Sequence, residues 1–126
     1  MNLPISIKGI IIYDNKVLLL KNERNEWELP GGRLEPDETP EQCVIREIKE
    51  ELNIFCSVKK LVDVWVYKVF SDRNVFIVTY LCECLGRPQI VISDEHMDYK
   101  WLDISKMESI HMPYGYKRSI SKVISW

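Results

Sequence analysis

No stretch of the sequence reaches the ~18 consecutive apolar residues that a membrane helix needs. The beginning, Met1-Asn2-Leu3-Pro4, lacks the charged and apolar regions of a secretory signal. A cationic excess is missing too, because 17 basic and 19 acidic side chains give a formal charge of −2. These absences argue against a membrane protein and against stable binding of nucleic acid through its phosphates. We therefore expect a cytoplasmic protein.

Cysteine occurs at four positions, and their spacing is not that of paired metal ligands. Cys82 and Cys84 lie one residue apart in an apolar run, so their side chains should share one face of a strand. Cys43 and Cys56 stand apart from them. We expect reduced, packed thiols rather than a zinc site or disulfides.

The length of 126 residues suits one compact domain, and neither an internal repeat nor a linker divides the chain. Apolar runs rich in β-branched residues alternate with turn sequences, and one central segment has the pattern of a helix. The sequence therefore predicts an α+β chain with strands before and after that helix. Strands are expected over residues 5–13, 16–21, 27–29, 61–70, 75–84, 89–92 and 99–102, with a second helix after Pro113.

The central helix has recognisable ends. Thr39 can cap it, Pro40 suits its first turn, and Gln42 completes a capping box. The helix should run to about Leu52 and end at Asn53, because asparagine tolerates the left-handed conformation of a C-terminal cap. Both ends are therefore set by the local sequence.

Three carboxylates of this helix, Glu47, Glu50 and Glu51, occupy an arc of roughly 100°. The neighbouring arc should face the core and is filled by apolar residues, namely Val44, Ile45, Ile48 and Leu52. Like charges at this spacing repel one another, and a hard divalent cation removes that repulsion by binding carboxylate oxygens. On the helix alone, a solvated acidic face with Arg46 and Lys49 as surface partners is nevertheless the simpler interpretation.

The wider pattern favours a metal site. Gly32 is followed after five residues by Glu38 and, seven residues later, by the run Arg46-Glu47-Ile48-Lys49-Glu50-Glu51-Leu52-Asn53-Ile54. This pattern over residues 32–54 closely resembles the Nudix box, and six such matches arise by chance in roughly one window in ten million. The preceding Trp27-Glu28-Leu29-Pro30-Gly31 is similar to the segment before the box in MutT-like members. The family usually has glycine where Asn53 stands, and asparagine can adopt the same cap.

The resemblance implies a Nudix fold, which is an α/β/α sandwich with a mixed β-sheet, formed by a single domain over residues 1–126. It also implies hydrolysis of a diphosphate linkage in a nucleotide by water. The favoured substrate is a nucleoside triphosphate, including an oxidised one, cleaved to the monophosphate and pyrophosphate. The alternatives are an ADP-ribose or nucleotide-sugar pyrophosphatase and a non-catalytic nucleotide sensor. Phe70 stands where many ADP-ribose pyrophosphatases have proline, which disfavours that substrate.

Carried over residue by residue, the resemblance makes Glu47, Glu50 and Glu51 ligands of Mg²⁺ or Mn²⁺. The backbone carbonyl of Gly31 is a further ligand in MutT-like enzymes. Arg46 would orient a box glutamate through a charge-assisted hydrogen bond, and Glu38 would hold the preceding loop against the helix. The implied catalytic residues are Glu50, Glu51, Arg46 and Glu95.

Glu95 is included because Ser93-Asp94-Glu95-His96 resembles a late acidic loop that supplies the general base in some members. An exposed loop acid is an equally good interpretation of Glu95, and a loop or packing role is favoured for His96. The expected partner is a small nucleotide substrate, and a homodimer is compatible with the resemblance because many relatives form dimers. Several side chains are candidates for contacts with the nucleotide, although solvation or core packing is the simpler interpretation for each: Lys21, Arg24, Trp27, Trp65, Tyr67, Phe76, Tyr80 and the tail residues Lys117, Arg118 and Lys122.

Overall fold

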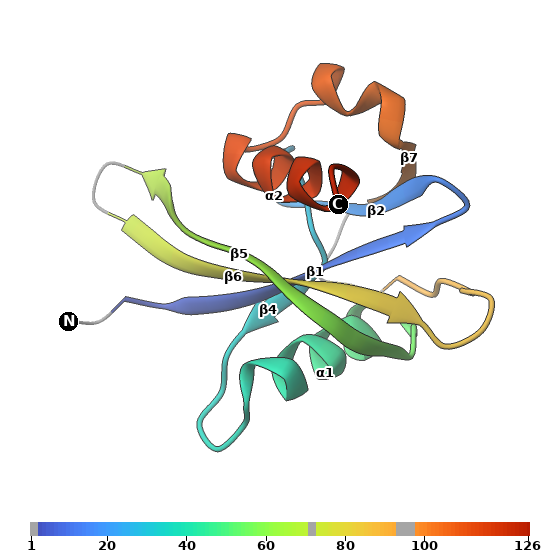
Figure 1. Cartoon of the computed structure of the whole chain (residues 1–126). Coiled ribbons are helices and arrows are strands. Elements are labelled where there is room, and N and C mark those ends of the chain that lie inside the picture. Colours follow the sequence, from blue (N-terminus) through green and yellow to red (C-terminus); the bar gives the residue numbers. More distant parts are fainter. Residues whose placement is uncertain (1–2, 71–72, 93–97) are drawn as a thin grey trace.

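The computed structural model describes residues 3–70, 73–92 and 98–126 of the chain. Two helices cover opposite faces of a twisted β-sheet, which confirms the expected α/β/α sandwich (Figure 1). In chain order the elements are β1 (Ile5–Tyr13), β2 (Lys16–Lys21), β3 (Trp27–Glu28), β4 (Gly31–Arg33), α1 (Pro40–Leu52), β5 (Cys56–Phe70), β6 (Arg73–Cys84), β7 (Asp98–Asp103), the 3-10 helix η1 (Ile104–Ser109) and α2 (Tyr114–Ile124).

Within the described ranges the sheet has seven strands in the order β3-β2-β1-β6-β5, with β4 paired to β1 and β7 paired to β2. The pair β1–β6 is parallel, whereas β5–β6, β1–β2 and β1–β4 are antiparallel. The sheet is therefore mixed, as expected. The element β1 lies at its centre and contacts three other strands.

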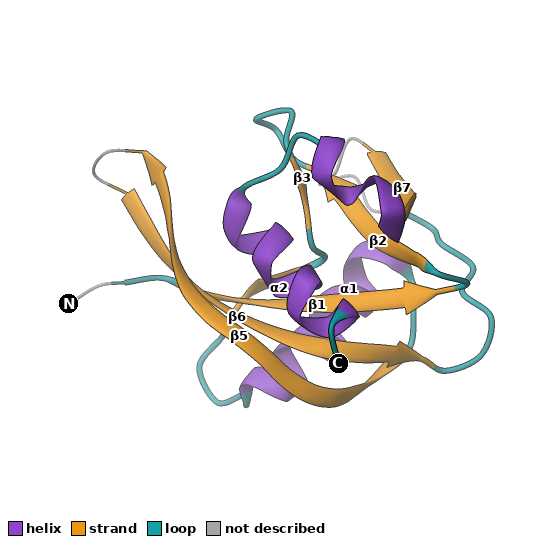
Figure 2. Cartoon of the chain, turned by 45° about the horizontal axis from the view of Figure 1, so that its top comes forward, coloured by secondary structure: helices purple, strands orange, loops and turns teal. Residues whose placement is uncertain are grey.

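Alternation along β1 separates two apolar cores. Ile7 and Ile11 are fully buried in the core shared with α1, whereas Ile10 is buried in the core shared with α2. Successive side chains of a strand point to opposite faces, so one apolar strand contributes to both layers. Figure 2 shows α1 and α2 on the two sides of the sheet. By the same alternation, the side chain of Lys8 points to the α2 face.

The ends of α1 agree with the prediction. The Thr39 hydroxyl accepts a hydrogen bond from the Gln42 amide, and the Gln42 side chain accepts one from the Thr39 amide, at 3.1 and 2.9 Å. Asn53 ends the helix in the left-handed conformation with φ 56°. One expectation about the helix was wrong, because Ile45 is 37% exposed while Glu51 is 4% exposed. Residue 51 lies only about 20° from Val44 around the helix axis, so it occupies the buried stripe in place of Ile45.

The structure corrects several expected elements. Residues 89–92 are not a strand; the Val91 amide donates to the Leu52 carbonyl, so this segment contacts the end of α1 instead. The strand expected from residue 61 begins at Cys56. Both β4 and η1 were missed. The glycines of β4 carry no strand signal, and this strand forms because its backbone pairs with β1.

A buried carboxylate fixes α2 to the sheet. Asp63 of β5 accepts hydrogen bonds from Arg118 Nε, Ser119 Oγ and Lys122 Nζ at 3.1, 2.9 and 2.9 Å. Burial alone raises the pKa of Asp63, but these donors outweigh it and the net pKa lies below the ordinary value. Two of the basic residues expected on a solvated helix face therefore bind the sheet. Among the described helices, none is long and apolar enough to cross a membrane.

The four cysteines are free, as expected. Cys43, Cys56 and Cys82 are buried, whereas Cys84 is partly exposed. Cys82 lies in the core beneath α1, where it packs with Cys56. Cys56 and Cys82 contribute apolar packing to this core, whereas Cys43 Sγ also donates to the Gly32 and Arg33 carbonyls at 3.7 and 3.5 Å.

Candidate metal and nucleotide site

Glu51 turns its carboxylate towards β4. Its Oε1 accepts a hydrogen bond from the Gly31 amide at 2.9 Å, and the side chain is almost fully buried. Gly31 has φ +142° and approaches β1 so closely that a Cβ there would collide with the Ile7 carbonyl. Only glycine tolerates both the conformation and this approach. The two glycines therefore allow β4 to contact the C-terminal part of α1, the helix that carries the box glutamates.

Glu47 lies against the second glycine of β4. A Cβ on Gly32 would collide with the Glu47 carboxyl group, so the absence of a side chain makes room for this glutamate. Burial raises the pKa of Glu47 above its ordinary value, although the hydrogen bond from Arg46 lowers it. The neighbouring charge of Glu50 raises it further. A partly desolvated carboxylate beside like charges is the environment in which a cation is favourable.

Arg46 joins the loop before the helix to the helix itself. It donates to both carboxylate oxygens of Glu38 at 3.0 and 2.8 Å, to Glu47 at 3.0 Å and to Glu50 at 3.2 Å. These bonds lower the pKa of Glu38 to about 2. A further bond goes to the Arg33 carbonyl at 3.3 Å. One guanidinium thus holds three carboxylates and a strand, which is the geometry that its planar fork favours.

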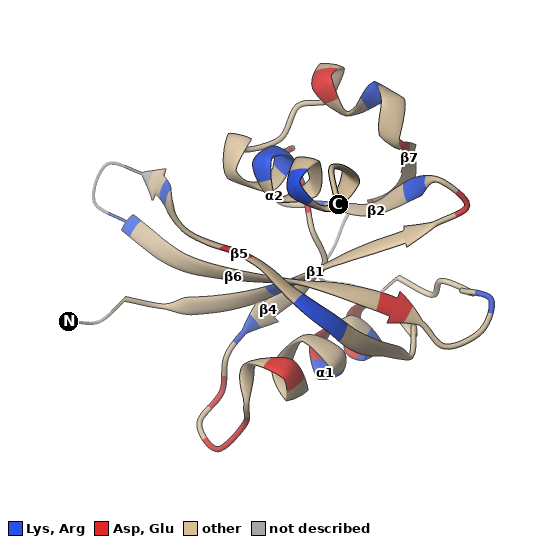
Figure 3. Ribbon diagram, in the orientation of Figure 1, with Lys and Arg blue, Asp and Glu red and all other residues tan. Residues whose placement is uncertain are grey.

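The structure therefore brings together most of the residues implied by the resemblance. Glu47 and Glu50 meet at Arg46, Glu51 meets Gly31, and Glu50 is the most exposed of the three, with 60% of its side chain accessible. Acidic residues, red in Figure 3, occur along α1 and the loop before it. Glu95 and His96 lie outside the described residues, so their roles stay predictions.

The donor set fits a hard divalent ion. Three carboxylates lie on one helix, and carboxylate oxygens are what Mg²⁺ and Mn²⁺ prefer. In the part of the chain that the structure describes, no three acidic, cysteine or histidine side chains converge closely enough to hold a metal without movement. Glu47 and Glu50 point to Arg46 and would turn from it to bind an ion. The carboxylates therefore suit a divalent ion in their chemistry and in their position on one helix, but their side chains would have to reorient to bind it.

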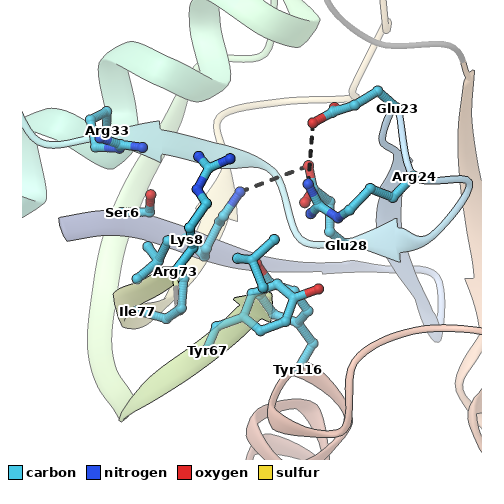
Figure 4. A pocket seen from close by; sticks show the side chains of 12 residues that line it. Ser6, Lys8, Glu23, Arg24, Glu28, Arg33, Tyr67, Arg73, Ile77 and Tyr116 are labelled. Carbon is cyan, nitrogen blue, oxygen red and sulfur yellow. Dashed lines mark hydrogen bonds and ion pairs between the residues drawn. The ribbon is translucent and has the colours of Figure 1, made fainter. Parts of the chain in front are cut away.

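A pocket of about 320 Å³ lies on the α2 side of the sheet (Figure 4). Strands β1, β3, β4, β5 and β6, helix α2 and the residues after β2 contribute to its walls. Its lining consists of Ser6, Lys8, Glu23, Arg24, Glu28, Arg33, Tyr67, Val69, Arg73, Val75, Ile77 and Tyr116. Arg33 connects the pocket to the box, because its carbonyl accepts the hydrogen bond from Arg46.

Lys8 and Glu28 form an ion pair inside this pocket. Lys8 Nζ lies 4.0 Å from Glu28 Oε1, and the two side chains are 9% and 12% exposed. Asn22 Nδ2 donates to the other oxygen of Glu28 at 3.2 Å. Burial lowers the pKa of Lys8, but the charges of Glu28, Tyr116, Glu51 and Glu47 raise it, and the net pKa lies above its ordinary value. Lys8 therefore lines the pocket and is also within electrostatic reach of two glutamates of the box.

Sequence reasoning found some pocket residues and missed others. Arg24 and Tyr67 were candidates and do line the pocket, whereas Lys21 lies over the Trp27 ring at 5.4 Å, and Trp65 packs edge-on against Tyr116 at 5.0 Å. Lys8 and Glu28 were missed. A lysine among the isoleucines of a strand was the available signal, since charge is unexpected in a buried strand.

Comparison with known proteins identifies the family. The model of the NUDIX domain family matches residues 5–126, so the chain belongs to this family. It is 41% identical to the 8-oxo-dGTP diphosphatase of Escherichia coli K12 over 91% of this chain and 92% of the relative. It is 28% identical to the ADP-ribose pyrophosphatase of Methanocaldococcus jannaschii over 97% of this chain and 73% of the relative. Among solved structures, the MutT protein of Methanosarcina mazei Go1 has a TM-score of 0.79 and 25% identity, over 94% of this chain and 91% of that one.

The family and these relatives define the class of protein. The chain is a Nudix hydrolase of the pyrophosphatase type, which acts on pyrophosphate bonds of small nucleotides. Enzymes of this family generally need divalent metal ions. The two relatives are named for different nucleotides, so membership of the family does not by itself define the substrate of this chain.

Proposed function

We propose that the protein hydrolyses nucleoside triphosphates to monophosphates and pyrophosphate. The observation that carries this proposal is that the pocket adjoins the box: Arg33 lines the pocket and also contacts Arg46, which binds Glu47 and Glu50. A base and sugar in the pocket would extend their phosphates towards these carboxylates. The lining has four basic and two acidic side chains, which favours an anionic ligand.

Glu47, Glu50 and Glu51 would hold the metal, together with the carbonyl of Gly31. The bound ion, Mg²⁺ or Mn²⁺, supplies charge neutralisation between acidic protein and anionic substrate and lowers the pKa of water. Glu51 has a fixed position, because the Gly31 amide donates to it. Arg46, itself held by Glu38, keeps Glu47 and Glu50 close to the site, and the two glutamates would turn from Arg46 to bind the ion. Glu51 is thus in place before the ion binds, whereas the other two carboxylates would reorient.

The reaction is the attack of water on phosphorus. A P–O bond to the water oxygen forms, the anhydride P–O bond breaks, and pyrophosphate leaves. A carboxylate must accept the proton of the water. Glu50 is the accessible candidate within the box, and Glu95 is the candidate in the later loop.

A triphosphate is favoured by the relative with 41% identity over nearly the full length of both chains, named for a diphosphatase of an oxidised deoxynucleoside triphosphate. The alternative is ADP-ribose, favoured by the relative that aligns with 97% of this chain at 28% identity. The two substrates differ in their products. A triphosphate yields pyrophosphate, whereas ADP-ribose yields AMP and ribose 5-phosphate.

The experiment is product analysis with a panel of nucleotides, with and without Mg²⁺ or Mn²⁺. The panel contains normal and oxidised triphosphates, ADP-ribose and nucleotide sugars, and pyrophosphatase is added in parallel samples to convert pyrophosphate to phosphate. We expect metal-dependent release of pyrophosphate from triphosphates. Turnover of ADP-ribose alone would replace the proposal by its alternative, and metal binding without any turnover would favour a sensor. When box glutamates are replaced with glutamine in this assay, Glu83→Gln is the matched control. Glu83 is an exposed glutamate on β6, outside the box, and pairs with Lys59.

A further inference from the structure

The buried ion pair between Lys8 and Glu28 is unusual among the ion pairs of this structure. Both of its side chains are at most 12% exposed, whereas Lys122 and Arg118, which bind the buried Asp63, are 45% and 40% exposed. Removing two charges from water offsets most of their attraction, so such a pair contributes little to stability compared with apolar side chains. Five of the nine residues of β1 are isoleucines, and an apolar side chain of this kind would pack at position 8 without charge. The fold therefore gives no reason for this pair.

The position of the pair points to a ligand. Lys8 Nζ and Glu28 Oε1 are 4.0 Å apart, which is longer than the 2.7–3.2 Å of a good hydrogen bond. Figure 4 shows the two side chains facing each other in the pocket, with Tyr67 and Tyr116 in the same lining. The pair thus presents a proton donor and an acceptor side by side in a cavity that also has aromatic and apolar walls.

Glu28 decides which kind of group fits. Asn22 donates to one of its oxygens and so holds the carboxylate in place beside Lys8. A phosphate oxygen bound to Lys8 would lie close to this carboxylate, and the two like charges would repel each other. A neutral carbonyl oxygen bound to Lys8 would not be repelled in this way, because it carries no net charge. An N–H group next to that carbonyl would in addition donate to Glu28.

We propose that Lys8 determines specificity by donating a hydrogen bond to a ring carbonyl oxygen of the base, while Glu28 accepts from the adjacent ring N–H. This assignment rests on the proposed function, because it makes the pocket the site of the base. Guanine, hypoxanthine, uracil and thymine have a carbonyl beside a ring N–H, whereas adenine has no carbonyl. The ligand class is therefore a nucleotide with a keto base, including oxidised guanine. Flat rings of this kind match the aromatic and apolar walls.

The test uses binding and so does not depend on turnover. Titration calorimetry with Mg²⁺ compares GMP with 2-aminopurine riboside 5′-monophosphate, which lacks the ring carbonyl and the adjacent N–H but keeps the sugar and phosphate. We expect the protein to bind GMP at least ~100-fold more tightly, since sites built for such hydrogen bonds reject analogues that lack them by large factors. In the Lys8→Met variant the preference should fall below about 10-fold, mainly through weaker binding of GMP.

Two further variants distinguish the loss of the Lys8 contact from a general loss of folding. Lys8→Met removes the cation that lies 4.0 Å from Glu28, so the double variant Lys8→Met/Glu28→Gln removes both charges of the pair and should show the same loss of preference. Lys59→Met is the matched control. Lys59 also pairs with a glutamate from a strand, at 3.3 Å from Glu83, but it is half-exposed and outside the pocket lining. We expect this control to keep the preference of the unmodified protein.

Two outcomes would overturn the proposal. The first is equal binding of the two nucleotides by the unmodified protein, or no binding of either. The second is an unchanged preference in Lys8→Met. If both nucleotides then bind this variant more weakly by the same factor, Lys8 contacts the phosphate instead of the base. The proposed function fails separately, through absence of pyrophosphate release, so the two results can be told apart.

Discussion

The two faces of the sheet differ in how their functional residues are arranged along the chain. On the α1 face, the acidic site comes from one continuous segment, with Gly31 and Gly32 beside the box helix. On the α2 face, the pocket is assembled from five strands, the residues after β2 and a helix. A continuous segment has fixed spacing and is readable as a pattern. A pocket assembled from distant segments has no spacing to read, so the class of chemistry was predictable from the sequence, whereas most of the lining of this pocket was not.

The largest effect is expected on the α1 face. Replacing Glu50 or Glu51 with Gln should lower turnover at least ~100-fold, because each change removes a carboxylate proposed to hold the metal. A glutamine at position 51 can still accept the Gly31 amide bond, so the fold should persist. Steady-state kinetics and circular dichroism measure the two properties. Near-normal activity in both variants would refute the metal assignment.

A second variant tests whether strand β4, with its two glycines, positions Glu47. Gly32→Ala introduces a Cβ that collides with the Glu47 carboxyl group, so the side chain must move. We expect a loss of turnover of roughly 10- to 100-fold, as for other changes that misplace a metal ligand. Gly86→Ala is the control, since a Cβ there meets nothing within 4 Å and its φ of +89° makes the change one of backbone strain only. That control should lower the melting temperature and leave turnover unchanged.

A substitution on the α2 face is expected to lower the stability of the protein. Asp63→Asn removes the charge that binds Arg118 and Lys122, and we expect it to lower the free energy of unfolding by about 2 kcal/mol. Because the folded pKa of Asp63 lies below the ordinary 3.8, its contribution is complete above that pH and is lost as the pH falls towards the lowered value. Denaturant unfolding between pH 6 and 2 should therefore show a smaller acid-induced loss for the variant than for the unmodified protein. Equal losses would mean that Asp63 does not provide this dependence.

The smallest effect is expected at the departure from the family pattern. Asn53 already adopts φ 56°, and glycine at this position would keep the bond from its amide to the Lys49 carbonyl. Asn53→Gly should change turnover by less than about 2-fold and stability by only a few tenths of a kcal/mol. Kinetics and thermal unfolding in parallel would detect a larger change. A large loss of turnover would show that the cap also positions Glu50 or Glu51.

The extent of sequence prediction follows from the range of the interactions. The ends of α1 were predictable because Thr39, Gln42 and Asn53 act on their own backbone neighbours. The strand β4 was not, because its hydrogen bonds come from β1, more than twenty residues away. Ile45 and Glu51 were assigned to the wrong environments, since an apolar pattern does not reveal that a buried glutamate will be satisfied by Gly31. Lys8 was missed because its partner, Glu28, belongs to another strand.

The register of β1 constrains how the protein can change during evolution. Lys8 and Gly31 are opposite each other in the antiparallel pair, with Lys8 facing the pocket and the Gly31 amide bound to Glu51. A slip of one residue would turn Lys8 into the α1 core and Ile7 into the pocket, and every other side chain of the strand would change face as well. Insertions or deletions in this segment would therefore disturb both faces at once. Substitutions at position 8 can therefore change substrate preference without changing the fold, whereas selection should remove insertions and deletions in β1.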